Sequence, residues 1–433
     1  MKGSFGAVPL RMTDGLGEVQ PLRMTVRRFD LQPGLFCGRN EEAAFGRVDL
    51  KKYLDRFKYI WVFAGYYLAM AMIIVLISKY LKDKGLTAEQ IGVVVSAATV
   101  FSMILQPVVG AAQEMISSKV ATALTLGISG VTGFVFAFMD SYIMMVLLYG
   151  FTMGLFYSVE PYLDRLAVEA PHPYRALRGG GTIGFAIGAQ ICGLVYEHIS
   201  PMMLYWLYII FTASAIVCML CSKGVGEGLK REKKKYGKEV FGNGMLWKYM
   251  LVLALFYVNC NLNITFLPIF YTSSGVSEST YGLILLLATL MELPVLWSAK
   301  RFINRMSNAT LITLVFLMQI LQFGTYVLVP VTAVRAVASV LLRSSTTMIM
   351  VMANLKVIGS IVKPEYVLSA LTLCYAVPKN LVTVVMQVVG GRIIDTFSYE
   401  GMYLMLIGIA VTGGIIARLF KIPTASGTET LFD

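Results

Sequence analysis

The sequence predicts an all-α membrane protein with twelve transmembrane helices in two six-helix halves. The chain has 433 residues, of which 57% are hydrophobic and only 14% are charged, whereas a soluble chain carries roughly a quarter charged residues. Its charges gather in short patches between apolar runs of about 20 residues or more, and such a run can cross a bilayer as a helix. Helices are expected because lipid cannot satisfy backbone polar groups.

The apolar runs divide evenly around one polar stretch. We predict a polar amino-terminal tail at 1–50, a first half at 51–222, a basic cytoplasmic linker at 223–246, a second half at 247–421 and a carboxyl-terminal tail at 422–433. The predicted spans are 58–81, 88–113, 119–139, 141–167, 176–197, 200–222, 247–271, 278–299, 309–330, 332–355, 369–391 and 396–420.

The basic residues indicate the orientation of the chain. They lie in alternate loops and in the linker, which contains "GLKREKKKYGK", and positive charge is retained on the cytoplasmic side of a membrane. We therefore expect a multi-pass protein of the plasma (inner) membrane with both termini in the cytoplasm. The net charge of +12 follows from this arrangement, so membrane lipids are the expected partners and nucleic acid is not. A monomer is the expected functional unit.

Three charged residues lie inside predicted spans of the second half. Glu292 is deep in the eighth span, Arg343 is near the centre of the tenth, and Lys379 is near the centre of the eleventh. A charge at a helix centre costs about 2.5–3.5 kcal/mol on insertion. We expect these side chains to face an aqueous cavity or one another, with Asn263 of the seventh span beside them. A purely structural salt bridge of Glu292 with Arg343 or Lys379 is the alternative.

A second group of charges joins the fourth and fifth spans, in "EPYLDRLAVEAPHPYRALRGGG". Glu160 and Asp164 are four residues apart and therefore share one helix face. Arg178 begins the next span. Hydropathy places this group toward the cytoplasmic end, where an interfacial salt bridge and a substrate site both fit the pattern.

The two halves contain similar segments at equivalent places. "PVVGAAQEMISSK" follows the second span and "PVLWSAKRFINRM" follows the eighth, while "GLVYEHIS" ends the fifth and "GRIIDTFS" ends the eleventh. These matches indicate a duplicated unit. Transporters built from two parallel repeats bind their substrate between the halves, near the middle of the membrane.

Several segments resemble a known family. "GLTAEQIGVVVSAATVFSMILQPVVGAAQE" and "EPYLDRLAVEAPHPYRALRGGGTIGFAIG" resemble the lactose permease-like and nucleoside–proton symporter-like branch of the major facilitator superfamily, and "MELPVLWSAKRFINR" and "GGRIIDTFSYEGMYLML" resemble its carboxyl half. The resemblance covers residues 55 to 420. It implies the major facilitator fold and secondary transport.

The resemblance also implies which residues bind the substrate. Glu160 and Arg178 match the glutamate and arginine, 18 residues apart, that bind the sugar in lactose permease. Phe185 stands where a tryptophan stacks on that sugar. Lys379 matches a lysine of the eleventh helix, and Asn263 stands in place of its aspartate partner. These five residues are the predicted substrate-binding set.

The chain departs from the family at the proton-coupling positions. Arg343 replaces a histidine of the tenth helix, and a threonine replaces the proton-handling glutamate. A proton would therefore need another carboxylate, which leaves Glu160, Asp164 and Glu292. We assign Asp164, Glu292 and Arg343 as proton-coupling or cavity charges. Glu114 stands where the superfamily's loop motif has its aspartate, which implies gating at the cytoplasmic face.

The predicted function is secondary active import of a small polar solute, a sugar, oligosaccharide or nucleoside, by proton symport with alternating access. One alternative is an organic-anion proton symporter, because Glu160 and Glu292 oppose three cations, Arg178, Arg343 and Lys379. Drug efflux by the same fold is another. No HExxH motif, catalytic aspartate pair or cofactor loop is present, so we expect no enzyme activity, no cofactor and no metal site.

Overall fold

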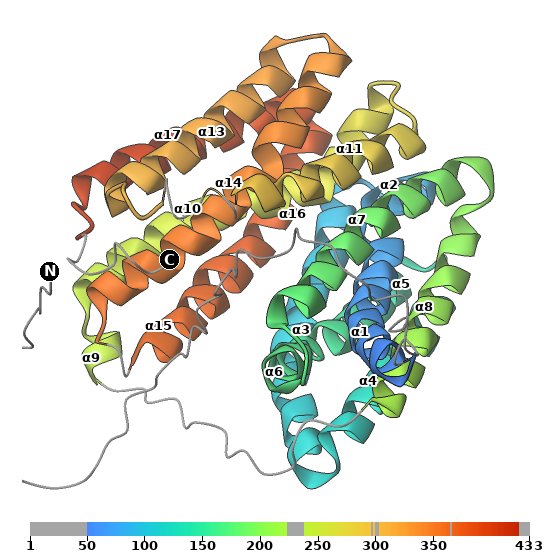
Figure 1. Ribbon diagram of the computed structural model, residues 1–433. Coiled ribbons are helices and arrows are strands. Elements are labelled where there is room, and N and C mark those ends of the chain that lie inside the picture. The colour runs from blue at the N-terminus through green and yellow to red at the C-terminus, as the bar shows by residue number, and fades with distance from the viewer. Residues whose placement is uncertain (1–49, 223–237, 296–297, 299–302, 364–365, 424–433) are drawn as a thin grey trace, which may run out of the picture. The chain divides into compact units, whose positions relative to one another are not determined.

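The computed structural model describes residues 50–222, 238–295, 298, 303–363 and 366–423 (Figure 1). Every regular element in these residues is a helix. Within this described part of the chain, twelve helical segments are long and apolar enough to cross a membrane, and they coincide with the twelve predicted spans. Of the predicted tails and linker, residues 1–49, 223–237 and 424–433 lie outside the described part of the chain.

The first six spans contain eight helices. They are α1 (Leu50–Ile74), α2 (Ile77–Asp83), α3 (Ala88–Met115), α4 (Ser118–Phe136), α5 (Tyr142–Tyr157), α6 (Glu160–Glu169), α7 (Tyr174–His198) and α8 (Pro201–Cys221).

The remaining spans follow a short helix at the end of the linker. The elements are α9 (Lys238–Phe241), α10 (Gly244–Ser273), α11 (Glu278–Leu290), α13 (Asn308–Leu328), α14 (Thr332–Ile361), α15 (Val367–Cys374), the π-helix η2 (Tyr375–Val382), α16 (Thr383–Thr396) and α17 (Tyr399–Leu419).

Two spans are interrupted where the sequence places proline. The fourth span breaks between α5 and α6, and Pro161 lies in the first turn of α6, where its missing N–H is not needed. The eleventh span changes to π-helix at η2, which contains Pro378. Proline removes a helical hydrogen bond, and single π turns are found often at functional sites. Both interruptions lie beside charges singled out from the sequence.

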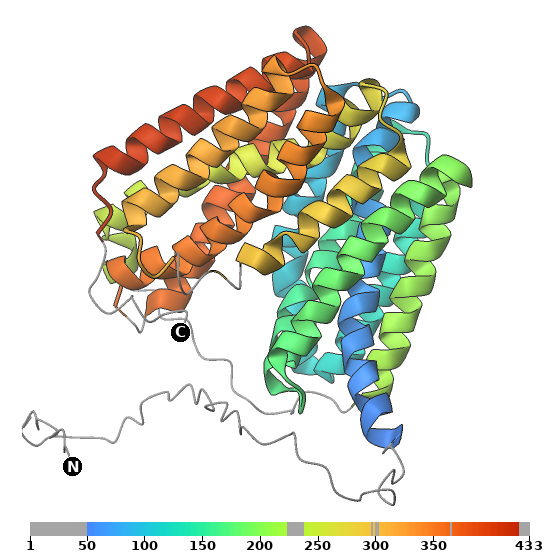
Figure 2. The same ribbon diagram turned by 45° about the horizontal axis from the view of Figure 1, so that its top comes forward.

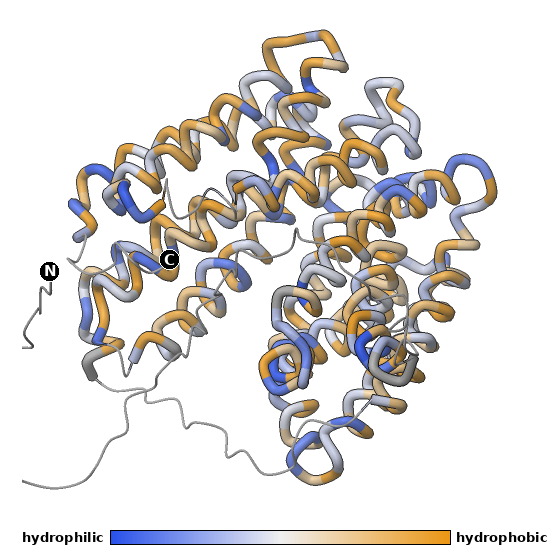
Figure 3. The backbone as a smooth tube through the Cα atoms, viewed as in Figure 1, coloured by the Kyte–Doolittle hydropathy of each residue, from blue (hydrophilic) through white to orange (hydrophobic). Residues whose placement is uncertain are grey.

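Most of the packing joins helices that are distant in sequence. Helix α1 packs on α7 and α8, α3 packs on α5, and α13 packs on α17. The two halves meet where α7 packs on α11 and where α3 packs on α16 (Figures 1 and 2). Hydrophobic residues run along the helices, and hydrophilic residues gather at turns and helix ends (Figure 3). This distribution fits a membrane-spanning bundle.

Glycines of α7 let this helix approach α1 closely. A Cβ atom added at Gly181 would lie 2.6 Å from the ring of Tyr67, and one added at Gly184 would lie 2.6 Å from the carbonyl oxygen of Ala64. Small residues allow such approach between membrane helices. The contact brings Tyr67 of α1 against the first turns of α7, where Arg178 lies.

Candidate functional site

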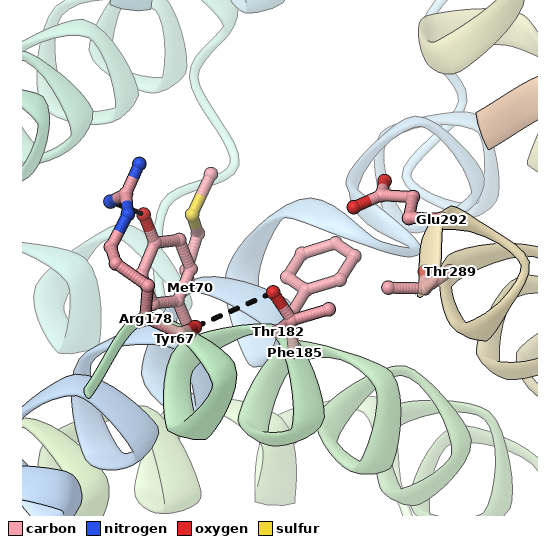
Figure 4. A pocket seen from close by; sticks show the side chains of 7 residues that line it. All are labelled: Tyr67, Met70, Arg178, Thr182, Phe185, Thr289 and Glu292. Atoms are coloured by element: carbon pink, nitrogen blue, oxygen red, sulfur yellow. Dashed lines mark hydrogen bonds between the residues drawn. The ribbon is translucent and has the colours of Figure 1, made fainter. Parts of the chain in front are cut away.

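A cavity of about 290 Å³ lies between α1, α7 and the eighth span. Figure 4 shows its lining side chains, five from the first half and two from the second. The lining residues are Tyr67, Met70, Arg178, Thr182, Phe185, Thr289 and Glu292. Clefts of a few hundred Å³ with few polar groups are the usual form of small-molecule sites. The position between the halves is the one expected from the repeats.

Arg178 is held on one wall of this cavity by two partners. Its Nη1 donates a hydrogen bond to the hydroxyl of Tyr67 at 3.3 Å and lies 3.0 Å from Oδ1 of Asp164. The Arg178 and Asp164 side chains remain 40% and 60% exposed, so the ion pair itself contributes little stability. Its effect is to orient the guanidinium while leaving donors available to a ligand.

Arg178, Thr182 and Phe185 form one face of α7. Their spacing of four and then three residues puts them on the same side of a helix. The hydroxyl of Thr182 donates to the carbonyl oxygen of Arg178 at 3.5 Å. The Phe185 ring lies beside Thr182 and faces the wall that carries Glu292 (Figure 4). The cavity therefore has an aromatic surface between a guanidinium and a carboxylate.

Glu160 begins α6, just after the break in the fourth span. The end of α5 before this break is held by Tyr66, whose hydroxyl donates to the Phe156 carbonyl at 3.0 Å and whose ring stacks on that of Phe156 at 4.2 Å. Glu160 is half-buried and close enough to interact electrostatically with Lys379 and Arg178. Two other predicted substrate-binding residues, Arg178 and Lys379, thus act on the Glu160 carboxylate.

Lys379 comes from the opposite half, on the π-helix η2. Its side chain is exposed, and its Nζ lies 5.6 Å from the centroid of the Tyr375 ring, a distance at which cations are attracted to an aromatic face. No carboxylate forms an ion pair with Lys379 within the described residues. Lys379 also interacts electrostatically with Glu160 of the first half.

Glu292 and Arg343 are neighbours that do not bond. Glu292 interacts electrostatically with Arg343. The sequence left open a structural salt bridge of Glu292 with Arg343 or Lys379, and neither pair is formed in the part of the chain that the structure describes. The Nε of Arg343 is buried without a hydrogen-bond partner. Glu292 lines the cavity.

Of the predicted site residues, three line the cavity: Arg178, Phe185 and Glu292. Glu160, Asp164, Arg343 and Lys379 lie outside its lining, and so do Asn263 and Glu114. Asn263 is 3% exposed, and its side-chain oxygen accepts a hydrogen bond from the Tyr403 hydroxyl at 3.3 Å, so it packs within the second half. Glu114 is exposed in the last turn of α3. Sequence reasoning missed the lining residues Tyr67, Met70, Thr182 and Thr289. Thr182 could have been found, because it shares the helical spacing of Arg178 and Phe185.

The sequence pattern described as the MFS_1-like family matches residues 56–405. This match covers most of the chain. The chain belongs to the MFS_1-like family. It is therefore a multi-pass membrane transporter and not an enzyme, as the sequence predicted.

Similar proteins cover nearly the same length. The chain is 22% identical over 391 residues to the uncharacterized transporter YwbF of Bacillus subtilis (strain 168), covering 89% of this chain and 97% of that protein. It is 24% identical over 378 residues to the lactose permease of Klebsiella oxytoca, covering 80% and 88%. A maltose permease of Geobacillus stearothermophilus is 24% identical over 275 residues, covering 60% and 68%.

Solved structures share the fold. A crystal structure of a variant of the nucleoside transporter NupG superposes with a TM-score of 0.75 at 14% identity, covering 84% of this chain and 99% of that chain. A bacterial homolog of the human lysosomal transporter Spinster, in an inward-facing and unoccupied conformation, superposes with a TM-score of 0.64 at 12% identity, covering 88% and 100%. The predicted fold of twelve helices in two halves is confirmed.

Proposed function

We propose that this MFS_1-like transporter imports a small polar solute, a sugar, oligosaccharide or nucleoside, together with a proton across the plasma membrane. The observation that carries the proposal is the cavity between the halves, in which Arg178 and Glu292 flank the ring of Phe185. Rocking of the halves around this site gives alternating access. Both termini then lie in the cytoplasm, since the basic loops do.

The polar groups suit a ring that carries hydroxyls. Arg178 donates charge-assisted hydrogen bonds, and Glu160 on the neighbouring helix accepts them. Phe185 packs against the apolar face of the ring. Lys379, brought near Glu160 from the other half, completes a binding surface to which both halves contribute.

The charges favour a neutral solute over an organic anion. The organic-anion alternative rests on two carboxylates, Glu160 and Glu292, that oppose three cations. That comparison does not include Asp164. The ion pair of Asp164 with Arg178 brings the cavity region to three carboxylates and three cations. The proposed carrier of the proton is one of the carboxylates Glu160, Asp164 and Glu292.

The names of similar proteins support this class of cargo. A lactose permease and a maltose permease are among the relatives, and a nucleoside transporter is among the structures that share the fold. Sugars and nucleosides both present a ring with several hydroxyl groups, which is the chemistry that the cavity suits.

The test is the external pH of a lightly buffered, de-energised suspension of cells that express the protein, with empty-vector cells as the control. Sugars, nucleosides and organic acids are added one at a time. We expect the suspension to become more alkaline with one sugar or nucleoside, because protons enter with the solute, and we expect a protonophore to abolish the change.

Two results would contradict the proposal in different ways. A labelled sugar or nucleoside that enters without any pH change would remove proton coupling and leave sodium symport or facilitated diffusion. Alkalinisation with organic acids alone would replace the neutral solute by an anion.

A further inference from the structure

The two most extensive contacts between the halves, α7 with α11 and α3 with α16, each end in a carboxylate that binds the start of a helix in the opposite half. We propose that Asp395 and Glu197 are paired clasps that hold the halves together at one end of the bundle, and that release of these clasps opens this end to solute. We call it the clasp end; it contains the turns before α3 and α11.

The first clasp joins α16 to α3. Oδ1 of Asp395 accepts a hydrogen bond from the backbone N–H of Ala88 at 2.9 Å, and Oδ2 accepts one from Glu89 at 2.8 Å. The side chain of Thr87, the N-cap of α3, accepts from the next N–H, that of Gln90. The first N–H groups of a helix have no partner inside it, so Asp395 satisfies two that α3 leaves open.

The second clasp joins α7 to α11 in the same manner. Oε2 of Glu197 accepts a hydrogen bond from the backbone N–H of Ser279 at 2.9 Å. The N-cap Ser277 accepts from Thr280 at 3.3 Å. In both clasps a negative charge lies at the positive end of a helix, which is the favourable arrangement. An ion pair between Lys79 and Glu278 at 3.5 Å adds a further link between the halves.

Glycines bring each pair of helices close enough for its clasp. A Cβ at Gly391 would collide with the carbonyl oxygen of Ala88, and one at Gly193 would collide with that of Glu278. One turn further along, a Cβ at Gly92 would lie 2.5 Å from the Gln387 oxygen and one at Gly282 would lie 2.7 Å from the Ala189 oxygen. We call the α3–α16 and α7–α11 contacts the two seams. At these four glycine positions no larger residue fits without moving the helices apart.

The two clasps occupy equivalent positions in the duplicated unit. In "GLVYEHIS" Glu197 follows Gly193 by four residues, and in "GRIIDTFS" Asp395 follows Gly391 by four. The repeated glycine and acid therefore form one device used twice. Asp395 accepts two hydrogen bonds and Glu197 accepts one, so each of these two contacts between the halves has a carboxylate at its end.

The hydrogen bonds of the clasps lie where water can reach them. Asp395 is exposed, and the hydrogen bond to the Glu89 N–H is exposed as well, so water can replace the carboxylate. Loss of a helix cap changes an equilibrium about fivefold. Two distant caps act independently, which gives about 25-fold for both.

The test measures the distance between the halves at the clasp end. Spin labels are attached at Lys82→Cys and Glu400→Cys, both exposed positions, after the native cysteines are replaced by serine. Double electron–electron resonance then reports the open-to-closed ratio of purified protein in lipid nanodiscs. We expect Asp395→Ala or Glu197→Ala to raise this ratio about fivefold, and the double variant to raise it about 25-fold. No solute is added, so the result does not depend on what the protein carries.

Asp140→Ala is the matched control. Asp140 lies at the same end and pairs with Lys84 at 2.8 Å, but this pair stays within the first half. We expect no change in the ratio. Gly391→Leu is a second way to open the clasp end. The leucine side chain forces α3 and α16 apart while both carboxylates stay intact, so this variant should also raise the open-to-closed ratio.

Two outcomes would overturn the proposal. One is a folded double alanine variant, judged by its melting temperature and elution volume, with the distance distribution of the parent. The other is an equal shift caused by Asp140→Ala, since the effect would then come from surface charge rather than from contact between the halves.

Discussion

At the scale of single residues, the contacts of Arg178 suit the role in solute binding that we propose for it. Tyr67 and Asp164 hold its guanidinium at 3.3 and 3.0 Å, so little side-chain entropy remains to be lost on binding. Three further N–H groups of the fork stay available. Lysine would keep the charge but has no planar fork, and it is therefore a poor substitute at this site.

We expect Arg178→Ala to reduce the initial rate of solute uptake about 10- to 100-fold, the loss of a hydrogen bond to a charged group. Arg178→Lys should lose less, because it can still pair with Asp164. The measurement is uptake of labelled solute at matched expression. Full uptake by Arg178→Ala would take this residue out of the binding site.

Phe185 should affect affinity more than turnover. Removing its ring in Phe185→Ala removes the apolar surface of the cavity, and we expect the apparent KM for uptake to rise about tenfold. Phe185→Trp keeps an aromatic face and should stay within about threefold of the parent. Equal KM values for the alanine variant and the parent would show that the ring does not contact the solute.

At the scale of elements, interruptions in two helices position the charges. Glu160 begins a new helix after the break in the fourth span, and Lys379 lies on the π-helix beside Pro378. Hydropathy describes each span as one continuous run, so neither interruption is visible in it. The glycines of α7 position a charge in a different way. They let α1 approach α7, and so they determine how near Tyr67 of α1 lies to Arg178.

The contact of α7 with α1 can be tested at one glycine. A Cβ at Gly184 would lie 2.6 Å from the Ala64 carbonyl oxygen, so Gly184→Leu must push the helices apart at a cost of about 1–3 kcal/mol. We expect a lower melting temperature of the purified protein and loss of uptake. Gly179→Leu on the same helix has nothing within 4 Å and should change stability by no more than about 0.5 kcal/mol. Equal melting temperatures for both variants would refute this role of Gly184.

At the scale of the whole molecule, the balance of charge supports the neutral cargo that we propose. Three carboxylates and three cations come from both halves, and the Asp164–Arg178 pair completes that balance. A neutral solute that travels with one proton moves one positive charge inward. An anion that travels with one proton moves none.

We therefore expect an inward current when the transported sugar or nucleoside is added to proteoliposomes that contain the protein. Each charge moved across 100 mV is worth about 2.3 kcal/mol, so an inside-negative potential should also increase accumulation of the solute. Liposomes without protein are the control. Uptake that is independent of potential and carries no current would favour the organic-anion alternative.

Much of the fold could be predicted because the bilayer imposes it. Hydropathy located all twelve spans, and helices followed from the need to satisfy backbone groups in lipid. Glu292 was singled out because a charge inside a span is costly, and the structure places it in the cavity wall. Asn263 was predicted to bind substrate because of its position in the seventh span. It instead accepts a hydrogen bond from Tyr403, a contact that no local sequence pattern reveals.

The sequence by itself determined the class of protein, its twelve spans and the repeated segments, because these depend on runs of neighbouring residues and on their transfer into lipid. Only the tertiary structure decided that Asp164 pairs with Arg178, that Tyr67 completes the site, and that Asp395 binds the start of α3. These contacts join residues from 14 to 307 positions apart. Such contacts depend on how helices pack rather than on local composition.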